Sequence, residues 1–485
     1  MNEPMKVHMV SLGCPKNRVD SEVILGEMVG SGYQTVGSPE GADVIVVNTC
    51  GFIDAAKEES VDTILEMAEH KKGSCSKLVV TGCLSQRYAP QLAKEIPEVD
   101  HFLGTGNFHG IVQALESGEL TPVVEEPSGR RILPIVQEHP RLKGANKLVP
   151  FRHEVEAGER SIYIPDPDFP LTAQSPRVAT QAIESQYVKV SEGCSNTCSF
   201  CIIPKLRGPQ RSRTIADVVL EAERLVGLGA VELNLIAQDL CAFGKDRAPR
   251  QNLAQLLRAL DKVGEKASAP VWIRCLYAYP RGLTREVMEV IGSGQSILPY
   301  LDMPLQHISD SMLRRMRRGK GGESTKELLR RLRREVPNLT LRTTFIAGMP
   351  GETEDDFKEL CDFVEELRFE RMGVFVYSPE EDTPAGEMPD QVPEEIARER
   401  AAALMEIQKQ ISLEQQQALV GTTVKVLVEG VSEETELLLQ GRHQGQAPDI
   451  DGVTYINSGE ASPGDVVDVE IEQAMDYDLV GGILS

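Results

Sequence analysis

The chain has 485 residues, 41% of them hydrophobic, and carries a formal net charge of −23. This length exceeds what a single hydrophobic core organises, so we expect two to four domains. The strong negative charge argues against a large nucleic-acid contact surface, which would need clustered lysines and arginines.

The compartment can be predicted from composition and from the first residues. No apolar run approaches the length of a membrane span. The segment Met1–Lys6 lacks the basic start and long apolar stretch of a secretory signal. Ten cysteines in a chain of this length fit metal binding in a reducing compartment better than a disulfide framework. We therefore expect a cytoplasmic protein without membrane association.

The first segment alternates between strand and helix patterns. The predicted strands are Lys6–Leu12, Asp43–Val47 and Lys77–Thr81, and the predicted helices are Asn17–Val29 and Asp54–His70. Such alternation predicts a parallel sheet covered by helices, which we assign to an N-terminal α/β domain over residues 4–117.

One cysteine follows each of these three strands, at Cys14, Cys50 and Cys83. Ligand sites in open parallel sheets lie at the carboxyl ends of the strands, so the three thiols should meet at one site. A single cysteine is more often a small buried hydrophobic residue. The matching placement of all three favours a joint role as metal ligands.

Residues 118–182 are rich in Pro, Glu and Arg and show no sustained period. We interpret this segment as an extended linker.

Three further cysteines, Cys194, Cys198 and Cys201, have the spacing C-x3-C-x2-C. Soft thiolate ligands select zinc or iron–sulfur centres. A structural zinc site would need a fourth ligand close by, but the nearest later cysteine is Cys241. The pattern therefore indicates a four-iron cluster in which one iron has no protein ligand and is open to a substrate.

Strands and helices alternate again in the region that we assign to residues 183–418. The predicted strands are Tyr187–Val190, Val231–Ile236, Val271–Leu276, Tyr300–Met303, Thr340–Ala347 and Gly373–Tyr377. Helices are expected between them, for example at Ile215–Leu228 and Glu354–Leu367, and a long charged helix is expected at Glu394–Ala418. Repeated strand–helix units of this type are found in β/α barrels, in which the loops at the C-terminal ends of the strands carry the chemistry.

The tail, residues 419–485, contains several short strand patterns. They lie at Thr423–Val428, Glu436–Gln440, Val453–Ile456 and Val466–Ile471, and suggest a small barrel of about five strands. From Val420 to Ser485 only Lys425 and Arg442 are basic, against thirteen Asp and Glu, for a net charge of −11. An acidic domain suits a basic protein partner, although acidic surfaces can also serve solubility alone.

The cysteine segments resemble the radical S-adenosylmethionine (SAM) superfamily, and in particular its methylthiotransferase branch. The matching segments are SLGCPKN (residues 11–17) with DSE (20–22), NTCGFI (48–53), GCLSQRY (82–88), and SEGCSNTCSFCIIP (191–204) followed by Arg207 and Gly208. The resemblance implies a cluster on Cys194, Cys198 and Cys201 that binds SAM and, when reduced, cleaves it to a 5′-deoxyadenosyl radical. It also implies an auxiliary four-iron cluster on Cys14, Cys50 and Cys83.

The resemblance extends to the fold. It implies a partial TIM barrel for residues 183–418 and a TRAM domain for the tail. The strand end FIAGMPGE (345–352) is similar to family motifs, and its turn would let the backbone approach SAM because glycine has no Cβ. We name Gly348, Pro350, Gly351 and Glu352 as candidate cofactor-binding residues, with an ordinary strand-to-helix turn as the alternative.

The CPKN form at residues 14–17 is closest to the branch that modifies a ribosomal protein. That branch implies methylthiolation of the β-carbon of an aspartate in the twelfth small-subunit ribosomal protein. One SAM would supply the methyl group and a second the radical, with a sulfur source and an external electron donor as further partners. An unactivated C–H bond is too weakly acidic for a side-chain base, so radical chemistry belongs to the cofactor. We identify no catalytic side chain beyond the cluster ligands.

Two other functions compete with this one. A tRNA adenosine methylthiotransferase would use the same chemistry, but the acidic tail and the CPKN form argue against it. A non-enzymatic iron–sulfur carrier would have no use for a barrel with SAM-type strand ends.

Overall fold

The computed structural model describes residues 3–106, 110–117, 153–157, 160–164, 167, 171–319 and 321–484. The chain packs as two compact units. The N-terminal unit comprises Met1–Thr180, Glu192–Asn196 and Cys201–Arg211; the C-terminal unit comprises Gln181–Ser191, Thr197–Phe200 and Ser212–Ser485. Among the described residues, no helix has both the length and the apolar character that crossing a membrane requires.

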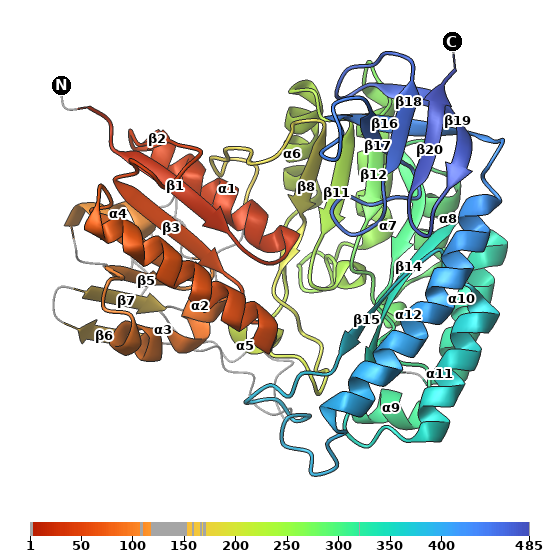
Figure 1. The fold of residues 1–485 in the computed structure, drawn as a ribbon, viewed down its shortest axis with the longest axis horizontal. Coiled ribbons are helices and arrows are strands. Elements are labelled where there is room, and N and C mark those ends of the chain that lie inside the picture. Colours follow the sequence, from red (N-terminus) through yellow and green to blue (C-terminus); the bar gives the residue numbers. More distant parts are fainter. Residues whose placement is uncertain are drawn as a thin grey trace. The chain divides into compact units, whose positions relative to one another are not determined.

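The N-terminal unit is built on a seven-stranded sheet in the order β2-β1-β3-β4-β5-β7-β6 (Figure 1). Its strands are β1 (Lys6–Ser11), β2 (Gln34–Thr35), β3 (Val44–Thr49), β4 (Lys77–Gly82), β5 (His101–Leu103), β6 (His153–Ala157) and β7 (Arg160–Ile164). Its helices are α1 (Pro15–Gly30), α2 (Asp54–Glu69), α3 (Cys83–Glu95), α4 (Gly110–Ser117) and α5 (Ile203–Arg207), with a 3-10 turn at His70–Lys72. All neighbouring strands are parallel except β6, which is antiparallel to β7. The predicted parallel sheet is confirmed.

Part of the segment expected to be a linker instead belongs to this sheet. Strand β7 pairs in parallel with β5, with Phe102 opposite Ile162, and β6 pairs with β7 as a hairpin. Ile162 and Ile164 are buried in the core of the unit. Two five-residue strands within a Pro- and Glu-rich segment give too short a periodic signal to detect. Residues 118–152 lie outside the described residues, and the boundaries 4–117, 118–182, 183–418 and 419–485 stay predictions.

The C-terminal unit contains a six-stranded parallel sheet whose spatial order follows the chain: β8-β11-β12-β13-β14-β15. These strands are β8 (Ser185–Lys189), β11 (Glu232–Ile236), β12 (Trp272–Cys275), β13 (Ile297–Asp302), β14 (Thr340–Ala347) and β15 (Arg371–Val376). The two-residue strands β9 (Ser191–Glu192) and β10 (Arg211–Ser212) flank the cysteine loop in the sequence. A helix after most strands gives the repeated β/α pattern of a partial barrel.

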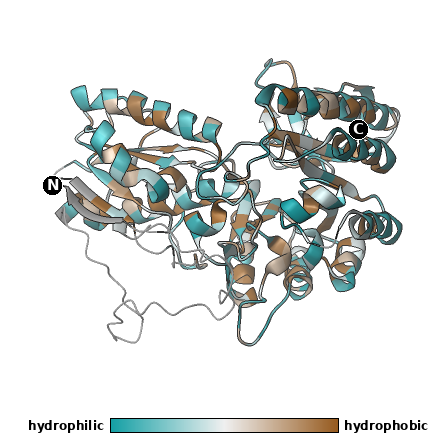
Figure 2. Cartoon of the chain, turned by 90° about the horizontal axis from the view of Figure 1, so that it is seen from below, coloured by the Kyte–Doolittle hydropathy of each residue, from teal (hydrophilic) through white to brown (hydrophobic). Residues whose placement is uncertain are grey.

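Most of the helices after these strands bury apolar residues in the same core as the sheet, while hydrophilic residues lie along their other faces (Figure 2). They are α6 (Ile215–Gly227), α7 (Leu253–Lys266), α8 (Arg285–Ser293), α9 (Asp310–Arg315), α10 (Gly322–Glu335), α11 (Glu354–Leu367) and α12 (Glu394–Gln417), with 3-10 turns at Leu240–Ala242 and Pro280–Gly282. Capping boxes start α7 at Asn252 and α11 at Thr353, which satisfies backbone N–H groups at those helix ends. Local sequence therefore fixes where these helices begin.

The tail forms a closed five-stranded barrel in the order β16-β17-β18-β20-β19. Its strands are β16 (Thr423–Val431), β17 (Leu439–His443), β18 (Thr454–Ser458), β19 (Val466–Ala474) and β20 (Leu479–Ile483). The predicted small barrel is confirmed, although the sequence patterns placed only four of its strands.

Buried charges join the tail barrel to the six-stranded sheet within the C-terminal unit. Arg442 on β17 and Arg274 on β12 both bind the fully buried carboxylate of Glu232, at 2.7 and 2.9 Å. Removing one partner of such a buried cluster costs several kcal/mol, because the remaining charge is left uncompensated. The tail is thus packed against the sheet as part of one unit.

Candidate functional site

Three cysteines lie at consecutive strand ends of the N-terminal unit, as the sequence predicted. We call Cys14, Cys50 and Cys83 the strand-end cysteines. Cys14 is the N-cap of α1, Cys50 follows β3, and Cys83 is the first residue of α3. A Cβ on Gly13 would lie only 2.8 Å from the Cβ of Cys50, so the loops after β1 and β3 are in close contact. The parallel sheet therefore brings together residues that are far apart in the sequence.

The strand-end cysteines lie close enough for their charges to act on one another. Burial, followed by the neighbouring thiols of Cys83 and Cys14, raises the pKa of Cys50 to about 12. Burial likewise raises the pKa of Cys83, although the Arg207 guanidinium counteracts part of this effect. Both shifts favour the protonated thiols of Cys50 and Cys83. Metal binding must release those protons, because thiolates are the ligands.

Asparagine side chains fix the loops that carry the strand-end cysteines. Asn48 donates to the carbonyl of Asn17 and to the hydroxyl of Ser21, each at 2.9 Å. Asn17 in turn donates to the carbonyls of Leu12 and Thr49, each at 3.0 Å. These bonds tie the start of α1 to the ends of β1 and β3. They fix the positions of the loops that carry Cys14 and Cys50 relative to each other.

Arg207 is the residue whose role sequence reasoning missed. Its guanidinium is buried, and Nη1 donates to Asp20 and to Glu192, both at 3.0 Å, while Nη2 donates to Asn17. Burial disfavours the cation, but Glu192 first, and then Cys83 and Asp20, keep the pKa of Arg207 well above its ordinary value. Arg207 therefore places a fixed positive charge beside the strand-end cysteines. The sequence marked Arg207 as part of the resembling segment, but it gave no signal for these partners.

Helix α5, which follows the second cysteine group, packs directly on Cys83. Ile202 and Leu206 are buried against it. The carbonyl of Leu206 accepts a 2.9 Å hydrogen bond from the hydroxyl of Thr105. The end of the loop that carries Cys201 is thus anchored inside the N-terminal unit.

We call Cys194, Cys198 and Cys201 the loop cysteines. The backbone N–H of Cys194 donates to the carbonyl of Gly208 at 3.0 Å. Gly193 precedes it with φ +75°, and a Cβ there would lie 2.3 Å from the carbonyl oxygen of Pro209. Only glycine fits this close approach of two backbone segments.

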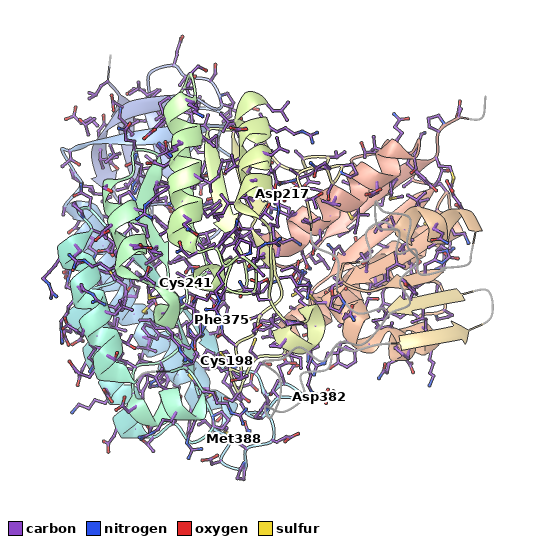
Figure 3. All side chains as sticks on the ribbon, turned by 180° about the vertical axis from the view of Figure 1, so that it is seen from behind. Cys198, Asp217, Cys241, Phe375, Asp382 and Met388 are labelled. Atoms are coloured by element: carbon purple, nitrogen blue, oxygen red, sulfur yellow. The ribbon has the colours of Figure 1, made fainter. Side chains whose placement is uncertain are left out.

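The middle of the loop belongs to the C-terminal unit. The backbone N–H of Ser199 donates to the carbonyl of Met316 at 3.1 Å, and its hydroxyl donates to the carbonyl of Arg315 at 2.6 Å. Cys198, labelled in Figure 3, receives a 3.7 Å hydrogen bond at Sγ from Nη1 of Arg318. Cys198 is therefore held on the segment that follows α9.

The donor atoms of the two cysteine groups are of the kind that iron–sulfur centres use. Within the described part of the chain, no three His, Cys, Asp or Glu side chains are gathered closely enough to hold one metal ion. A cluster places each thiolate on a different iron, so its ligands stand further apart than those of one ion. Each group supplies three soft sulfur ligands and an arginine beside one sulfur, a donor set suited to an iron–sulfur centre with one open iron.

The turn after β14 carries the four candidate cofactor-binding residues. Glu352 is buried, and its Oε2 accepts from the N–H groups of Gly348 and Met349. Gly348 has φ +82°, and a Cβ there would lie 2.2 Å from that of Ala397 on α12. The structure thus gives Gly348 and Glu352 a role in shaping the turn. Direct contact of Gly348, Pro350, Gly351 or Glu352 with SAM stays a prediction.

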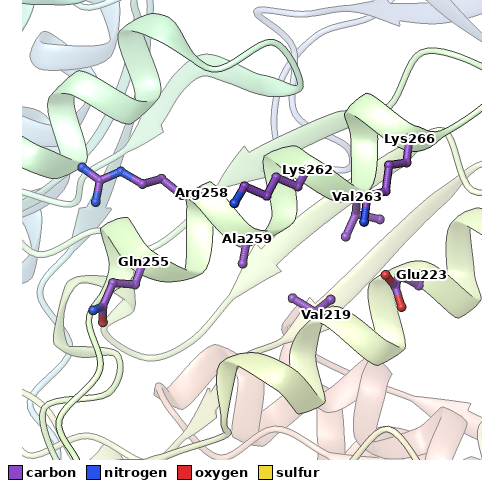
Figure 4. A pocket seen from close by; sticks show the side chains of 8 residues that line it. All are labelled: Val219, Glu223, Gln255, Arg258, Ala259, Lys262, Val263 and Lys266. Atoms are coloured by element: carbon purple, nitrogen blue, oxygen red, sulfur yellow. The ribbon is translucent and has the colours of Figure 1, made fainter.

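Figure 4 shows a groove between α6 and α7, at a distance in sequence from every predicted site residue. Its lining consists of Val219, Glu223, Gln255, Arg258, Ala259, Lys262, Val263 and Lys266. None of these is a cysteine or a strand-end residue. The cysteine groups, and not this groove, are the candidate reaction centre.

Family models match three parts of the chain. They are an uncharacterized protein family, UPF0004, over residues 6–104, the radical SAM superfamily over residues 188–364, and the TRAM domain over residues 420–484. The first two models each contain one of the cysteine groups.

Curated relatives match over nearly the whole length. "Ribosomal protein uS12 methylthiotransferase RimO" of Anaeromyxobacter sp. (strain Fw109-5) is 50% identical over 481 residues, covering 99% of this chain and 93% of the relative. The protein of the same name from Myxococcus xanthus is 50% identical over 482 residues, covering 99% and 92%. That from Geobacter sulfurreducens is 46% identical over 485 residues, covering 100% of both.

Solved structures share the fold at low sequence identity. The radical SAM methyltransferase TsrM from Kitasatospora setae, with cobalamin and a [4Fe-4S] cluster bound, gives a TM-score of 0.53 at 16% identity. The match covers 79% of this chain and 74% of TsrM. At this identity the match shows a likeness of fold alone.

Proposed function

Because this chain belongs to the RimO family of radical SAM methylthiotransferases, we propose that it methylthiolates ribosomal protein uS12, the twelfth protein of the small subunit. The proposed target atom is the β-carbon of one aspartate. The single observation that carries the proposal is the pair of three-cysteine groups in a chain that matches these relatives from end to end.

The radical SAM domain implies SAM and a [4Fe-4S] cluster as cofactors. We assign that cluster to the loop cysteines, and a second, auxiliary cluster to the strand-end cysteines. When bound, the first would supply one-electron cleavage of SAM and the second would hold the sulfur to be transferred. The reaction also needs an external electron donor and a sulfur source.

The protein's own residues fix the proposed cluster sites. Arg207 offsets negative charge beside Cys83 and is itself held by Asp20 and Glu192. Asn17 and Asn48 keep the strand-end loops in place. Delivery of a methylthio group to a short-lived carbon radical requires near-contact distances, so such fixed loops serve the reaction.

The surface of the tail barrel supports a protein substrate over tRNA. Arg442, one of its two basic residues, is 2% exposed and bonded to Glu232 and Glu429. The other, Lys425, forms an ion pair with Asp468 at 3.0 Å. Both cations of this domain are paired with carboxylates, so it offers little positive charge to a phosphate backbone, on which RNA binding relies. Ribosomal proteins are basic, and their charge complements this surface.

The test is a direct comparison of substrates. Protein reconstituted with iron and sulfide is given SAM and a chemical reductant, together with either uS12 or tRNA, and the products are read by mass spectrometry. We expect a methylthio mass increment on an aspartate of uS12 and none on tRNA. A methylthio adenosine in tRNA, with unmodified uS12, would overturn the proposal.

A further inference from the structure

The guanidinium of Arg318 occupies a defined position at the carboxyl-terminal side of the six-stranded sheet. Its Nη1 lies 3.7 Å from the sulfur of Cys198, and its Nη2 donates to the carbonyl of Pro304 after β13. Its carbon Cζ lies 4.1 Å from the centre of the Tyr279 ring, which follows β12. A sulfur, a carbonyl and an aromatic face thus fix one cation from three sides.

Backbone bonds hold this arrangement together. Arg318 donates its N–H to the carbonyl of Leu313 at 2.8 Å, in a turn where Arg317 has a φ of +55°. On the other side, the carbonyl of Ser199 accepts from the N–H of Ala385 at 2.9 Å, and the N–H of Ser199 donates to Met316. Ser199, the residue after Cys198, is therefore bonded through its backbone to the turn that carries Arg318. The short distance between Cys198 and Arg318 thus does not depend on side chains alone.

The charge of the chain makes such a cation useful. Reduction adds one negative charge to a cluster, and the chain already carries a net charge of −23. Distant surface charges are screened beyond about 10 Å, so a cation beside a ligand sulfur outweighs them locally. Hydrogen bonds to the sulfurs and local charge are among the factors that set cluster potentials. A donor bonded to a thiolate stabilises the more negative, reduced state.

We propose that Arg318 is a positioning residue that raises the reduction potential of the cluster held by the loop cysteines, through its hydrogen bond to Cys198 and held in place by Tyr279 and Pro304. The proposal rests on the proposed role of Cys198 as an iron ligand. It assigns a function to one arginine of the basic segment Leu313–Gly319, in which Arg314, Arg315, Arg317 and Arg318 follow closely on one another.

The test is a redox titration followed by electron paramagnetic resonance, without SAM, on the full-length reconstituted chain. The signal of the loop cluster is the one that disappears when Cys194, Cys198 and Cys201 are replaced by Ala. The variants are R318Q, which removes the cation, and R318K, which keeps the charge but lacks the planar guanidinium with its fixed N–H donors. The control is R314Q, which removes one exposed positive charge of the same segment.

At the midpoint potential of the parent, we expect the ratio of reduced to oxidised cluster to fall about tenfold in R318Q, equivalent to about 59 mV for one electron. The same ratio should fall about threefold in R318K and should stay within twofold of the parent in R314Q. An R318Q potential equal to that of R314Q would overturn the inference. If R318Q binds no iron, an unchanged potential in R318K overturns it instead. A parent chain without the loop cluster would contradict the proposed function itself, so the two failures are distinguishable.

Discussion

The two cysteine groups of this chain are built in opposite ways. The loop cysteines lie within eight consecutive residues, from Cys194 to Cys201, whereas the strand-end cysteines are spread from Cys14 to Cys83 and meet only because three parallel strands end side by side. The first group depends on a local loop conformation and the second on tertiary packing. The strand-end group should therefore respond to changes at the ends of the sheet strands, whereas the loop group should respond to changes in the turn after α9 that holds Ser199 and Cys198.

Each group also has an arginine beside one sulfur, but the two arginines are held differently. Arg207 is buried and bonded to two carboxylates, while Arg318 is partly exposed and stacked on an aromatic ring. Arg207 therefore divides its charge between two carboxylates and the neighbouring Cys83 thiol. The described contacts of Arg318 are a sulfur, a carbonyl and an aromatic ring, without a carboxylate.

The largest expected effect comes from removing the loop cysteines. Replacing Cys194, Cys198 and Cys201 with Ala should halve the bound iron and abolish 5′-deoxyadenosine formation, because only this group is proposed to present SAM to a reduced cluster. Iron analysis and chromatography of the products check both. Persistent 5′-deoxyadenosine would show that the loop cysteines are assigned wrongly.

A substitution that contains no cysteine should break the strand-end group selectively. Gly13 has φ +83° and its Cβ would meet Cys50, so Gly13→Ala should displace that loop and lower methylthio product at least about tenfold. SAM cleavage should stay close to that of the parent.

The matched control is Gly32→Ala. Gly32 has a similar φ, +94°, but its Cβ would meet nothing within 4 Å. The backbone strain is therefore comparable, about 1–2 kcal/mol, without the steric clash. Equal loss of product in both variants would mean that backbone strain, and not displacement of Cys50, explains the effect.

Acid should destabilise both units through one buried histidine each. Burial, reinforced by Lys77, lowers the pKa of His101 to about 4; burial, reinforced by Arg371, lowers the pKa of His443 to about 3. In the unfolded chain these histidines take up protons below about pH 6.5. Their contribution to the free energy of unfolding is therefore fully present above that pH and is lost as the pH falls towards the pKa values of the folded chain.

The loss should be about 1.4 kcal/mol per pH unit for each histidine once the pH is well below 6.5. Urea unfolding at pH 7.5, 6.0 and 5.0 measures it. His101→Gln should flatten the pH dependence of the N-terminal unit only, and His443→Gln that of the C-terminal unit only. A pH dependence unchanged by either substitution would contradict the assignment.

The smallest effect should come from the surface of the tail. Glu433, Glu436 and Asp465 are exposed carboxylates, and replacing them with Lys should slow modification of uS12 by about three- to tenfold at low salt, because charge complementarity accelerates encounter. The difference should shrink as salt rises. SAM cleavage without substrate serves as the control. Unchanged modification at every salt concentration would mean that this acidic surface serves solubility alone.

The sequence predicted most of what is periodic and local. The bounds of β14 at Thr340–Ala347 and of α11 at Glu354–Leu367 agree with the predicted ones, because β-branched residues and a capping box mark them. The convergence of the strand-end cysteines was also predictable, since parallel strands end on one edge of a sheet. The hairpin β6–β7 was missed because its strands are short and lie in an otherwise irregular segment.

The electrostatic partners could not be predicted from the sequence. Arg207 and Asp20 are 187 residues apart, and Arg442 and Glu232 are 210 apart. No periodicity links such pairs, because they are set by which loops and domains pack together. The same holds for Arg318, whose neighbours come from three separate strand ends and loops.

The most direct test of the division of labour between the two groups is the variant in which Cys14, Cys50 and Cys83 are all replaced by Ala. Reconstituted with iron and sulfide and given SAM, reductant and uS12, it should keep about half of the iron of the parent and still release 5′-deoxyadenosine, but form no methylthiolated uS12. Methylthiolated uS12 at the level of the parent would contradict the proposal that the strand-end cysteines hold the sulfur to be transferred.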